Sequence, residues 1–212
     1  MSEERLIPAQ ETEIKIEVLK SRFIATIKPA FSVEEARAFI KEIKHRYPDA
    51  SHHVPAFLIG FGTSTIAHCS DDGEPSGTAG RPILAVLKAS GLGDVVLVVT
   101  RYYGGTNLGT GGLVRAYSAA AKEVIENLIL AQKVLTTTVS LKLPYHWFEQ
   151  VNLLIEKHGG KILEREFAAD VSLKIQFIDE NVPVFDGDLQ QLTNGSVNLE
   201  IQNQHVEMIV PL

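Results

Sequence analysis

The chain of 212 residues contains a single cysteine, Cys69. One thiol cannot form an intramolecular disulfide, and it cannot build a zinc site that depends on several thiolates. Long apolar runs are also missing. The longest, DVVLVVT at residues 94–100, is far shorter than the roughly 20 apolar residues that span a bilayer. The opening residues MSEERLIPAQ lack the apolar core of a signal peptide. We therefore expect a soluble protein of the reducing cytoplasm, without a membrane partner.

Positive charge is scarce as well. The chain has 20 Lys and Arg against 26 Asp and Glu, a formal net charge of −6. Proteins that hold duplex nucleic acid mainly by neutralising phosphates are strongly basic. This charge therefore argues against that class, although a local basic groove is compatible with it. The hydrophobic fraction of 45% is typical of a globular protein with a real core.

Residues 1–131 contain alternating strand and helix patterns. Apolar and charged residues alternate over 12–20 and 22–28, which predicts two half-buried strands joined by a tight turn. The other predicted elements are a helix at 32–48 capped by Ser32, a strand at 52–61, a long loop at 62–79, a helix at 82–90, a buried strand at 94–100, a glycine-rich loop at 101–112 and a helix at 113–130. Pro55 within the third strand suggests an edge position or a bulge.

Residues 132–212 have a different pattern. The predicted order is a strand, a helix, a hairpin at 161–178, a helix at 182–195 and a final strand. This β-α-β-β-α-β order is the signature of a ferredoxin-like sandwich. Net charge divides as well, being −1 over 1–131 and −5 over 132–212. The predicted fold class is therefore α+β, with two domains at 1–131 and 132–212.

The segment SDDGEPSGTAGRP at 70–82 combines three carboxylates with three glycines. Asp71, Asp72 and Glu74 could converge on a hard cation, but their spacing is not that of an EF-hand. Turn chemistry is the favoured interpretation, because an Asp-Gly pair suits positive φ at Gly73. A structured loop of this length is usually functional. We expect its carboxylates to face outward, or toward Arg101 and Arg115.

Histidine and Cys69 form another candidate group. Cys69 with His52 or His53 could make a thiol–imidazole pair, because they lie on separate segments. Adjacent residues on a strand point to opposite faces, however, so at most one of these histidines could take part. A buried cysteine and partly buried histidines are the simpler interpretation. No catalytic set, metal site or cofactor is predicted.

The segment RYYGGTNLGTGGLVRAY at 101–117 is the sharper signal. Five glycines lie between a buried strand and a long helix, where backbone N–H groups can bind an anion. Arg101 and Arg115 flank the loop and could clamp a phosphate or carboxylate. Tyr102 and Tyr103 could stack on bases or anchor a protein. Neither nucleotide-binding fingerprint fits, and close helix packing explains the glycines equally well.

Three segments together resemble the IMPACT/YigZ family. They are HHVPAFLIG at 52–60, SDDGEPSGTAGRPIL at 70–84 and VVTRYYGGTNLGTGGLVRAY at 98–117. The resemblance implies a first domain like domain IV of elongation factor G and the GHMP kinases, and a second like the ferredoxin-like domain V of that factor. It implies a bacterial YigZ-type member, without the RWD domain of the eukaryotic members.

The resemblance also implies a role linked to translation, since eukaryotic members restrain the translational response to amino-acid starvation. We expect a non-enzymatic binding protein whose partner is the ribosome, a translation factor or RNA. The alternative is an enzyme or sensor that binds a phosphorylated small anion at residues 104–115. The residues expected to contact the partner or anion are Asp71, Asp72, Gly73, Glu74, Gly77, Thr78, Arg81, Arg101, Tyr102, Tyr103, Gly104, Gly105, Asn107, Gly109, Thr110, Gly111, Gly112 and Arg115.

Overall fold

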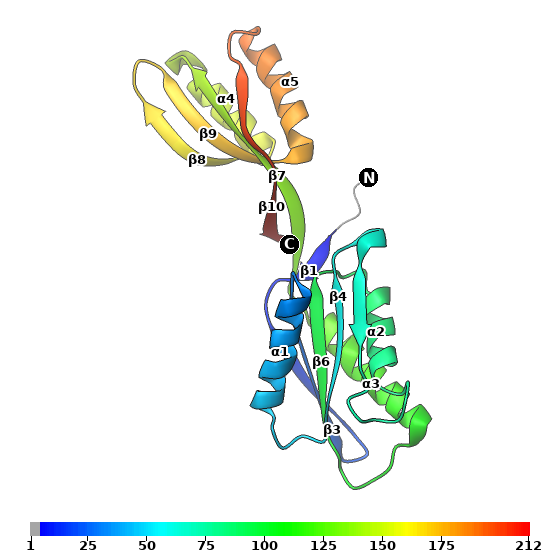
Figure 1. Ribbon diagram of the computed structural model, residues 1–212. Helices are drawn as coiled ribbons and strands as arrows, with labels where there is room; N and C mark the ends of the chain where they lie inside the picture. Colours follow the sequence, from blue (N-terminus) through cyan, green and yellow to red (C-terminus); the bar gives the residue numbers. More distant parts are fainter. Residues whose placement is uncertain (1–4) are drawn as a thin grey trace. The chain divides into compact units, whose positions relative to one another are not determined.

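The computed structural model describes residues 5–212, which form two compact units (Figure 1). The first unit extends to Gln132 and also takes in Pro211 and Leu212, while the second comprises Lys133–Val210. The described residues contain five α-helices and two β-sheets, which is the predicted α+β class. Within these residues, no helix has both the length and the hydropathy that a membrane crossing requires.

The sheet of the first unit has the strand order β2-β3-β6-β4-β5, and every neighbouring pair is antiparallel. Its strands are β2 (Thr12–Val18), β3 (Ser21–Pro29), β4 (His52–Ile59), β5 (Ile66–Cys69) and β6 (Val95–Tyr102). The central strand β6 is the apolar run DVVLVVT, and it is buried on both faces. A short strand, β1 (Leu6–Pro8), lies outside this sheet and pairs with residues 130–132.

Helices cover both faces of this sheet (Figure 1). α1 (Val33–Arg46) packs on one face, and α2 (Gly80–Ala89) and α3 (Gly109–Glu126) pack on the other. The side chains of β6 alternate accordingly: Leu97 and Val99 contact the α2/α3 layer, whereas Val96 and Val98 contact α1. Ser32 caps α1 by accepting the N–H of Glu35, as its sequence predicts.

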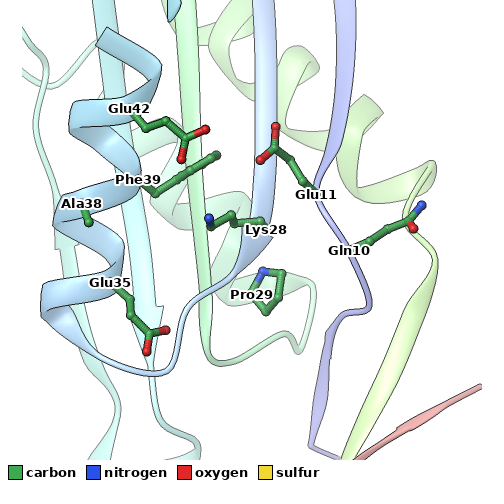
Figure 2. Close-up of a pocket in the computed structure, with 8 residues that line it drawn as sticks. All are labelled: Gln10, Glu11, Lys28, Pro29, Glu35, Ala38, Phe39 and Glu42. Carbon is green, nitrogen blue, oxygen red and sulfur yellow. The ribbon is translucent and has the colours of Figure 1, made fainter. Parts of the chain in front are cut away.

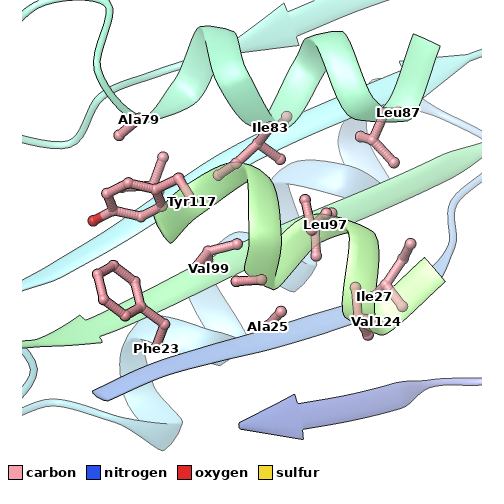
Figure 3. Packing of buried hydrophobic residues seen from close by; sticks show 14 of the residues in the cluster. Phe23, Ala25, Ile27, Ala79, Ile83, Leu87, Leu97, Val99, Tyr117 and Val124 are labelled. Atoms are coloured by element: carbon pink, nitrogen blue, oxygen red, sulfur yellow. The ribbon is translucent and has the colours of Figure 1, made fainter. Parts of the chain in front are cut away.

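The core beneath α2 and α3 contains one polar group that matters for the site. Figure 3 shows the ring of Tyr117 from α3 above Phe23 of β3. Their centroids are 5.2 Å apart in an edge-to-face arrangement, which is favourable for aromatic pairs. Tyr117 is fully buried, so its hydroxyl requires a partner inside the protein.

The second unit has its own core. It contains α4 (Phe148–Lys157), β8 (Lys161–Phe167), β9 (Val171–Ile178), α5 (Val182–Thr193) and most of β7 (Leu130–Leu143) and β10 (Leu199–Pro211). In this unit β10 pairs with β7, β7 with β9 and β9 with β8. Alternate residues of β9 are buried, namely Val171, Leu173, Ile175 and Phe177, as period-2 patterning predicts.

Two elements differ from the expectation. The predicted loop at 62–79 contains a short 3-10 helix, η1 (Gly62–Ser64), and the edge strand β5. Three of the four β5 residues are exposed, so the strand has no apolar alternation that would reveal it. α3 begins at Gly109 rather than 113, because glycine has a low helix propensity and hides the first turn.

The prediction that Pro55 lies at an edge or a bulge is wrong for β4 as a whole, because β4 pairs with strands on both sides. Pro55 is tolerated there because β5 pairs only with Ala56–Ile59. Beyond β5, the Pro55 carbonyl accepts the N–H of Ser70 at 3.2 Å. Proline has no backbone N–H, and at residue 55 no neighbouring strand needs that donor.

Candidate functional site

Asp71 organises the loop between β5 and α2. Its carboxylate accepts the N–H groups of Gly77 at 2.8 Å, Ala79 at 3.1 Å and Gly80 at 2.8 Å. Burial by itself raises the pKa of Asp71, but these bonds and the charge of Arg81 lower it below its ordinary value. Asp71 thus serves as the acceptor for the first amides of α2, which has no side-chain cap of its own.

Asp72 joins this loop to the sheet and to α1. Its carboxylate accepts from Lys44 Nζ at 2.7 Å and from the N–H of His53 at 2.6 Å. Its carbonyl oxygen lies 2.9 Å from His52 Nδ1. A carbonyl oxygen can only accept a hydrogen bond, so this contact places a proton on Nδ1 of His52.

Glu74 joins the segment 70–82 to β6 and α3. Its Oε1 accepts from Arg101 Nη1 at 2.7 Å and from the Tyr117 hydroxyl at 2.7 Å. The side chains of Glu74 and Arg101 are only 3% and 6% exposed. Burial, then the bond to Glu74, raise the pKa of Tyr117 far above its usual range, so the hydroxyl stays protonated and donates. We call these three residues the Glu74–Arg101–Tyr117 network.

This network bears on two expectations about the segment 70–82, which we call the acidic loop. The segment 70–82 does contact Arg101, the first residue of the second glycine-rich segment, a point that the sequence left open. The expectation that the carboxylates face outward is wrong, since all three accept hydrogen bonds within the protein. Glu74 does face Arg101, as the alternative expectation held. Arg115 is exposed and has no contact with them among the interactions of the described residues.

The second glycine-rich loop rests on the turn between β2 and β3. The N–H of Gly104 donates to Ser21 Oγ at 3.1 Å. A Cβ at position 104 would lie 2.1 Å from the carbonyl carbon of Lys20, so only glycine fits here. Beside it, the guanidinium of Arg22 stacks 4.3 Å above the ring of Tyr102. The next side chain, Tyr103, is 49% exposed.

A hollow of about 440 Å³ lies between the two loops. Arg101 and Glu74 line it on one side, and Gly109 and Thr110 at the start of α3 line it on another. Tyr103 and Asn107 also line it, and the Tyr103 hydroxyl donates to Asn107 Oδ1 at 3.1 Å. We call this space the interloop hollow. Its remaining lining residues are His52, Pro75, Leu108 and Leu113.

The predicted site residues fall into three groups. Six line the interloop hollow: Glu74, Arg101, Tyr103, Asn107, Gly109 and Thr110. Six others hold the loops in place or pack beside them: Asp71, Asp72, Gly73, Gly77, Thr78 and Gly104. Tyr102 stacks with Arg22, and the remainder lie outside the hollow: Arg81, Gly105, Gly111, Gly112 and Arg115.

Sequence reasoning missed the hollow's contribution from β4. His52 lines the interloop hollow, with Nε2 3.8 Å from Glu74 Oε1. The sequence singled it out only as a partner of Cys69, which instead pairs with Ala56 across β4 and β5 and does not line the hollow. Burial raises the pKa of the Cys69 thiol. A histidine as the first residue of a buried strand was the available signal.

A second hollow, of about 510 Å³, lies beside α1 (Figure 2). Glu11, Glu35 and Glu42 line it, together with Lys28, whose Nζ lies 4.7 Å from the centroid of the Phe39 ring. These carboxylates already have partners: Glu35 accepts the N–H of Phe31, and the other two pair with Arg46. Within residues 5–212, no group of three or more His, Cys, Asp or Glu is arranged to hold a metal ion.

Comparison with known proteins gives two family matches. The model of the Impact N-terminal domain matches residues 19–125. That of a domain of unknown function, DUF1949, matches residues 141–196. The first match covers both glycine-rich loops and every residue that lines the interloop hollow.

Similar proteins cover nearly the whole chain. IMPACT family member YigZ of Escherichia coli K12 is 38% identical over 92% of this chain and 96% of its own length. IMPACT family member YvyE of Bacillus subtilis 168 is 34% identical over 91% and 87%. A solved structure, described as that of a hypothetical protein, has a TM-score of 0.63 and 37% identity, and the match covers 96% of this chain and 99% of that one. The chain therefore belongs to the IMPACT family.

Proposed function

We propose that this chain is a non-enzymatic binding protein that docks onto the translation machinery through the exposed residues around its two glycine-rich loops. We call Arg22, Tyr102, Tyr103 and Asn107 the docking surface. The link to translation rests on the family resemblance. The observation that carries the docking role is the Glu74–Arg101–Tyr117 network, which ties the segment 70–82 to β6 and α3, the two elements that flank the second glycine-rich loop.

The network supports binding because it occupies the groups that catalysis would use. Glu74 is held by two donors and Asp71 by three backbone amides. A general acid or base needs a side chain that reaches the substrate. Here the carboxylates act as internal acceptors. A preorganised surface, in contrast, lowers the entropic cost of binding a partner.

The exposed residues beside the network have the composition of an interface. Tyr103 is 49% exposed, and Arg22 and Tyr102 present a stacked guanidinium and ring. Tyrosine and arginine are the residue types enriched at binding hot spots. Both also stack on nucleic acid bases. A partner that contains RNA or protein, as the ribosome does, suits this surface.

The proposal extends to the two domains and the compartment. Within the second unit the strand order β10-β7-β9-β8 supports a ferredoxin-like domain at 132–212. In residues 1–131 the sheet lies between α1 on one face and α2 and α3 on the other. This arrangement is compatible with the likeness to domain IV of elongation factor G. A role in translation in turn favours a cytoplasmic location.

Co-sedimentation with ribosomes at low salt tests the docking role. Tyr103→Ala and Arg22→Ala remove exposed parts of the docking surface, so each is expected to lower the bound fraction several-fold. Matched controls are Tyr145→Ala, at a tyrosine that is 51% exposed in the second unit, and Arg37→Ala on α1. The controls are expected to sediment like the wild type. If the wild type stays in the supernatant, or if all four variants behave alike, the proposal is wrong.

A further inference from the structure

We infer that the interloop hollow binds the phosphate group of a nucleotide, either free or within RNA. The inference rests on the proposed function for its location, because the hollow adjoins the docking surface. It goes further by assigning the chemistry of the ligand. With about 440 Å³, the hollow lies in the range of small-molecule sites, roughly 300–1,000 Å³.

The start of α3 supplies donors to this hollow. Gly109 and Thr110 line it, and the helix runs on for 18 residues, long enough for a marked dipole. Within residues 5–212 no side chain caps its first turn, and that turn contains no acidic residue. α1 has Ser32 at this position, and α2 has Asp71. The first amides of α3 are therefore available to an acceptor that approaches through the hollow.

Arg101 is the independent observation that points to a ligand in this hollow. Its side chain is 6% exposed and lines the hollow. Nη1 is bonded to Glu74, yet the buried Nε has no partner in the described part of the chain. Buried donors of charged groups are almost always satisfied. A phosphate has several acceptor oxygens, enough to reach a guanidinium and helix amides together.

Neighbouring side chains suit the rest of a nucleotide. Asn107 Oδ1 accepts from Tyr103, which leaves its amide nitrogen to donate. The ring of Tyr103 lies 5.5 Å from the Arg101 guanidinium and is half exposed, so it can stack on a base. Gly109 adds no steric barrier, since a Cβ there would meet nothing within 4 Å.

The charge balance of the hollow permits an anion. Among the described residues, Glu74 is the only acidic one that lines it, and Arg101 pairs with Glu74 at 2.7 Å. The pair is neutral overall. What remains is the positive end of the α3 dipole, which favours a negatively charged ligand.

Nuclear magnetic resonance titration of the full chain tests this inference. The probes are inorganic phosphate, adenosine monophosphate and a six-nucleotide single-stranded RNA. We expect the amide signals of Gly109–Gly112 to shift on adding the mononucleotide or the RNA in the millimolar range or below. Shifts with adenosine monophosphate would show that a free nucleotide is sufficient for binding. Shifts with the RNA alone would show that the hollow binds phosphate only as part of a polymer. Shifts with inorganic phosphate alone, or with none of the three, overturn the inference.

A charge substitution at the helix start provides the matched variant. Thr110→Asp places a carboxylate where the phosphate is expected, while a negative charge in the first turn is compatible with the helix. It should weaken nucleotide binding by about tenfold or more. Thr63→Asp makes the same change on η1, beyond the other end of β4, and should bind like the wild type. Equal affinities for the two variants would contradict the inference.

The same variants separate this inference from the docking role. If Thr110→Asp loses nucleotide binding but still sediments with ribosomes, the hollow is a nucleotide site and the inference holds. If the wild type binds nucleotide yet never sediments with ribosomes, the proposed function fails while the inference again holds. A wild type that sediments without any nucleotide-induced shift supports docking alone and overturns the hollow as a phosphate site.

Discussion

At the residue scale, the acidic loop shows how the same side chains support different hypotheses in sequence and in structure. Three carboxylates within four residues could have converged on a cation, although turn chemistry was the favoured interpretation. In the structure each carboxylate has a separate partner: backbone amides for Asp71, α1 and β4 for Asp72, and the buried network for Glu74. Their roles are structural because each satisfies buried donors that would otherwise be unpaired.

The first prediction concerns Asp71 and pH. Its folded-state pKa lies below the ordinary 3.8, so its stabilising effect is present above that value and is lost as the pH falls through the folded pKa. Asp71→Asn should lower the free energy of unfolding by about 1–3 kcal/mol at neutral pH. The gap to the wild type should narrow below about pH 4. Hydrogen exchange of the β6 amides at several pH values measures the free energy of unfolding of both proteins.

Asp170→Asn is the control for this prediction. Asp170 has a single ion-pair contact, at 3.5 Å from Lys142 Nζ, and removing such a contact changes stability by less than about 0.5 kcal/mol. If the difference in the free energy of unfolding between the wild type and Asp71→Asn stayed constant from neutral pH to pH 3, the negative charge of Asp71 would not be what stabilises the loop.

The second prediction concerns the ion pair within the network. Arg101→Met leaves the Glu74 carboxylate buried without its cation, and breaking a buried pair in this way costs about 3–5 kcal/mol. In the double variant Glu74→Gln with Arg101→Met, the uncompensated charge is gone, so it should be more stable than Arg101→Met alone. Thermal denaturation compares the two. The interpretation fails if adding Glu74→Gln to Arg101→Met does not raise the melting temperature.

At the scale of elements, glycines of the segment 101–117 are needed for different reasons. Gly104 is required because the loop lies directly on the backbone of the β2–β3 turn. Gly111 lies in the first turn of α3, where a Cβ would meet only Arg115 Nη1 at 3.7 Å. Both residues belong to one glycine-rich motif in the sequence, and only the packing distinguishes them.

The third prediction follows from this difference. Gly104→Ala should destabilise the protein by about 1–3 kcal/mol, because the new methyl group overlaps the carbonyl of Lys20. Gly111→Ala should be neutral or stabilising by up to about 1 kcal/mol, since alanine favours the helix. Melting temperatures of the two variants provide the measurement. The same melting temperature for both would show that the loop does not need its close approach to the turn.

Element prediction succeeded where the local pattern was strong. Ser32 caps α1 as predicted, and the apolar run of β6 is buried as expected. It failed for β5, whose residues are mostly exposed, and for the glycine-rich first turn of α3. In both places pairing and packing with distant residues, rather than local propensity, make the element.

At the scale of the whole molecule, the hydrophobic clusters divide as the two units do. In the described residues, the clusters around β6 contain residues of the first unit, and the cluster around β9 contains residues of the second. Each unit therefore has an independent source of stability, since apolar burial is the dominant favourable contribution to folding.

The fourth prediction tests this independence. Leu97→Ala removes a fully buried side chain from the first unit, and Phe177→Ala removes one from the second. Each should cost its own unit about 2–5 kcal/mol. Hydrogen exchange measured separately for β6 and β9 should show that each variant weakens protection in its own strand, while the other strand serves as the internal control. Equal loss in both strands would mean that the chain unfolds as one cooperative body.

The sequence by itself determined the α+β class, most helices and strands, and the family, because these depend on local periodicity, capping and motifs that can be read along the chain. Only the tertiary structure decided what the motifs do. Glu74 meets Arg101 across 27 residues and Tyr117 across 43. Such pairings depend on how β6 and α3 bring separate loops together, and no local pattern specifies them. Glu74 and Arg101 both line the interloop hollow, so it too is formed by residues far apart in the sequence.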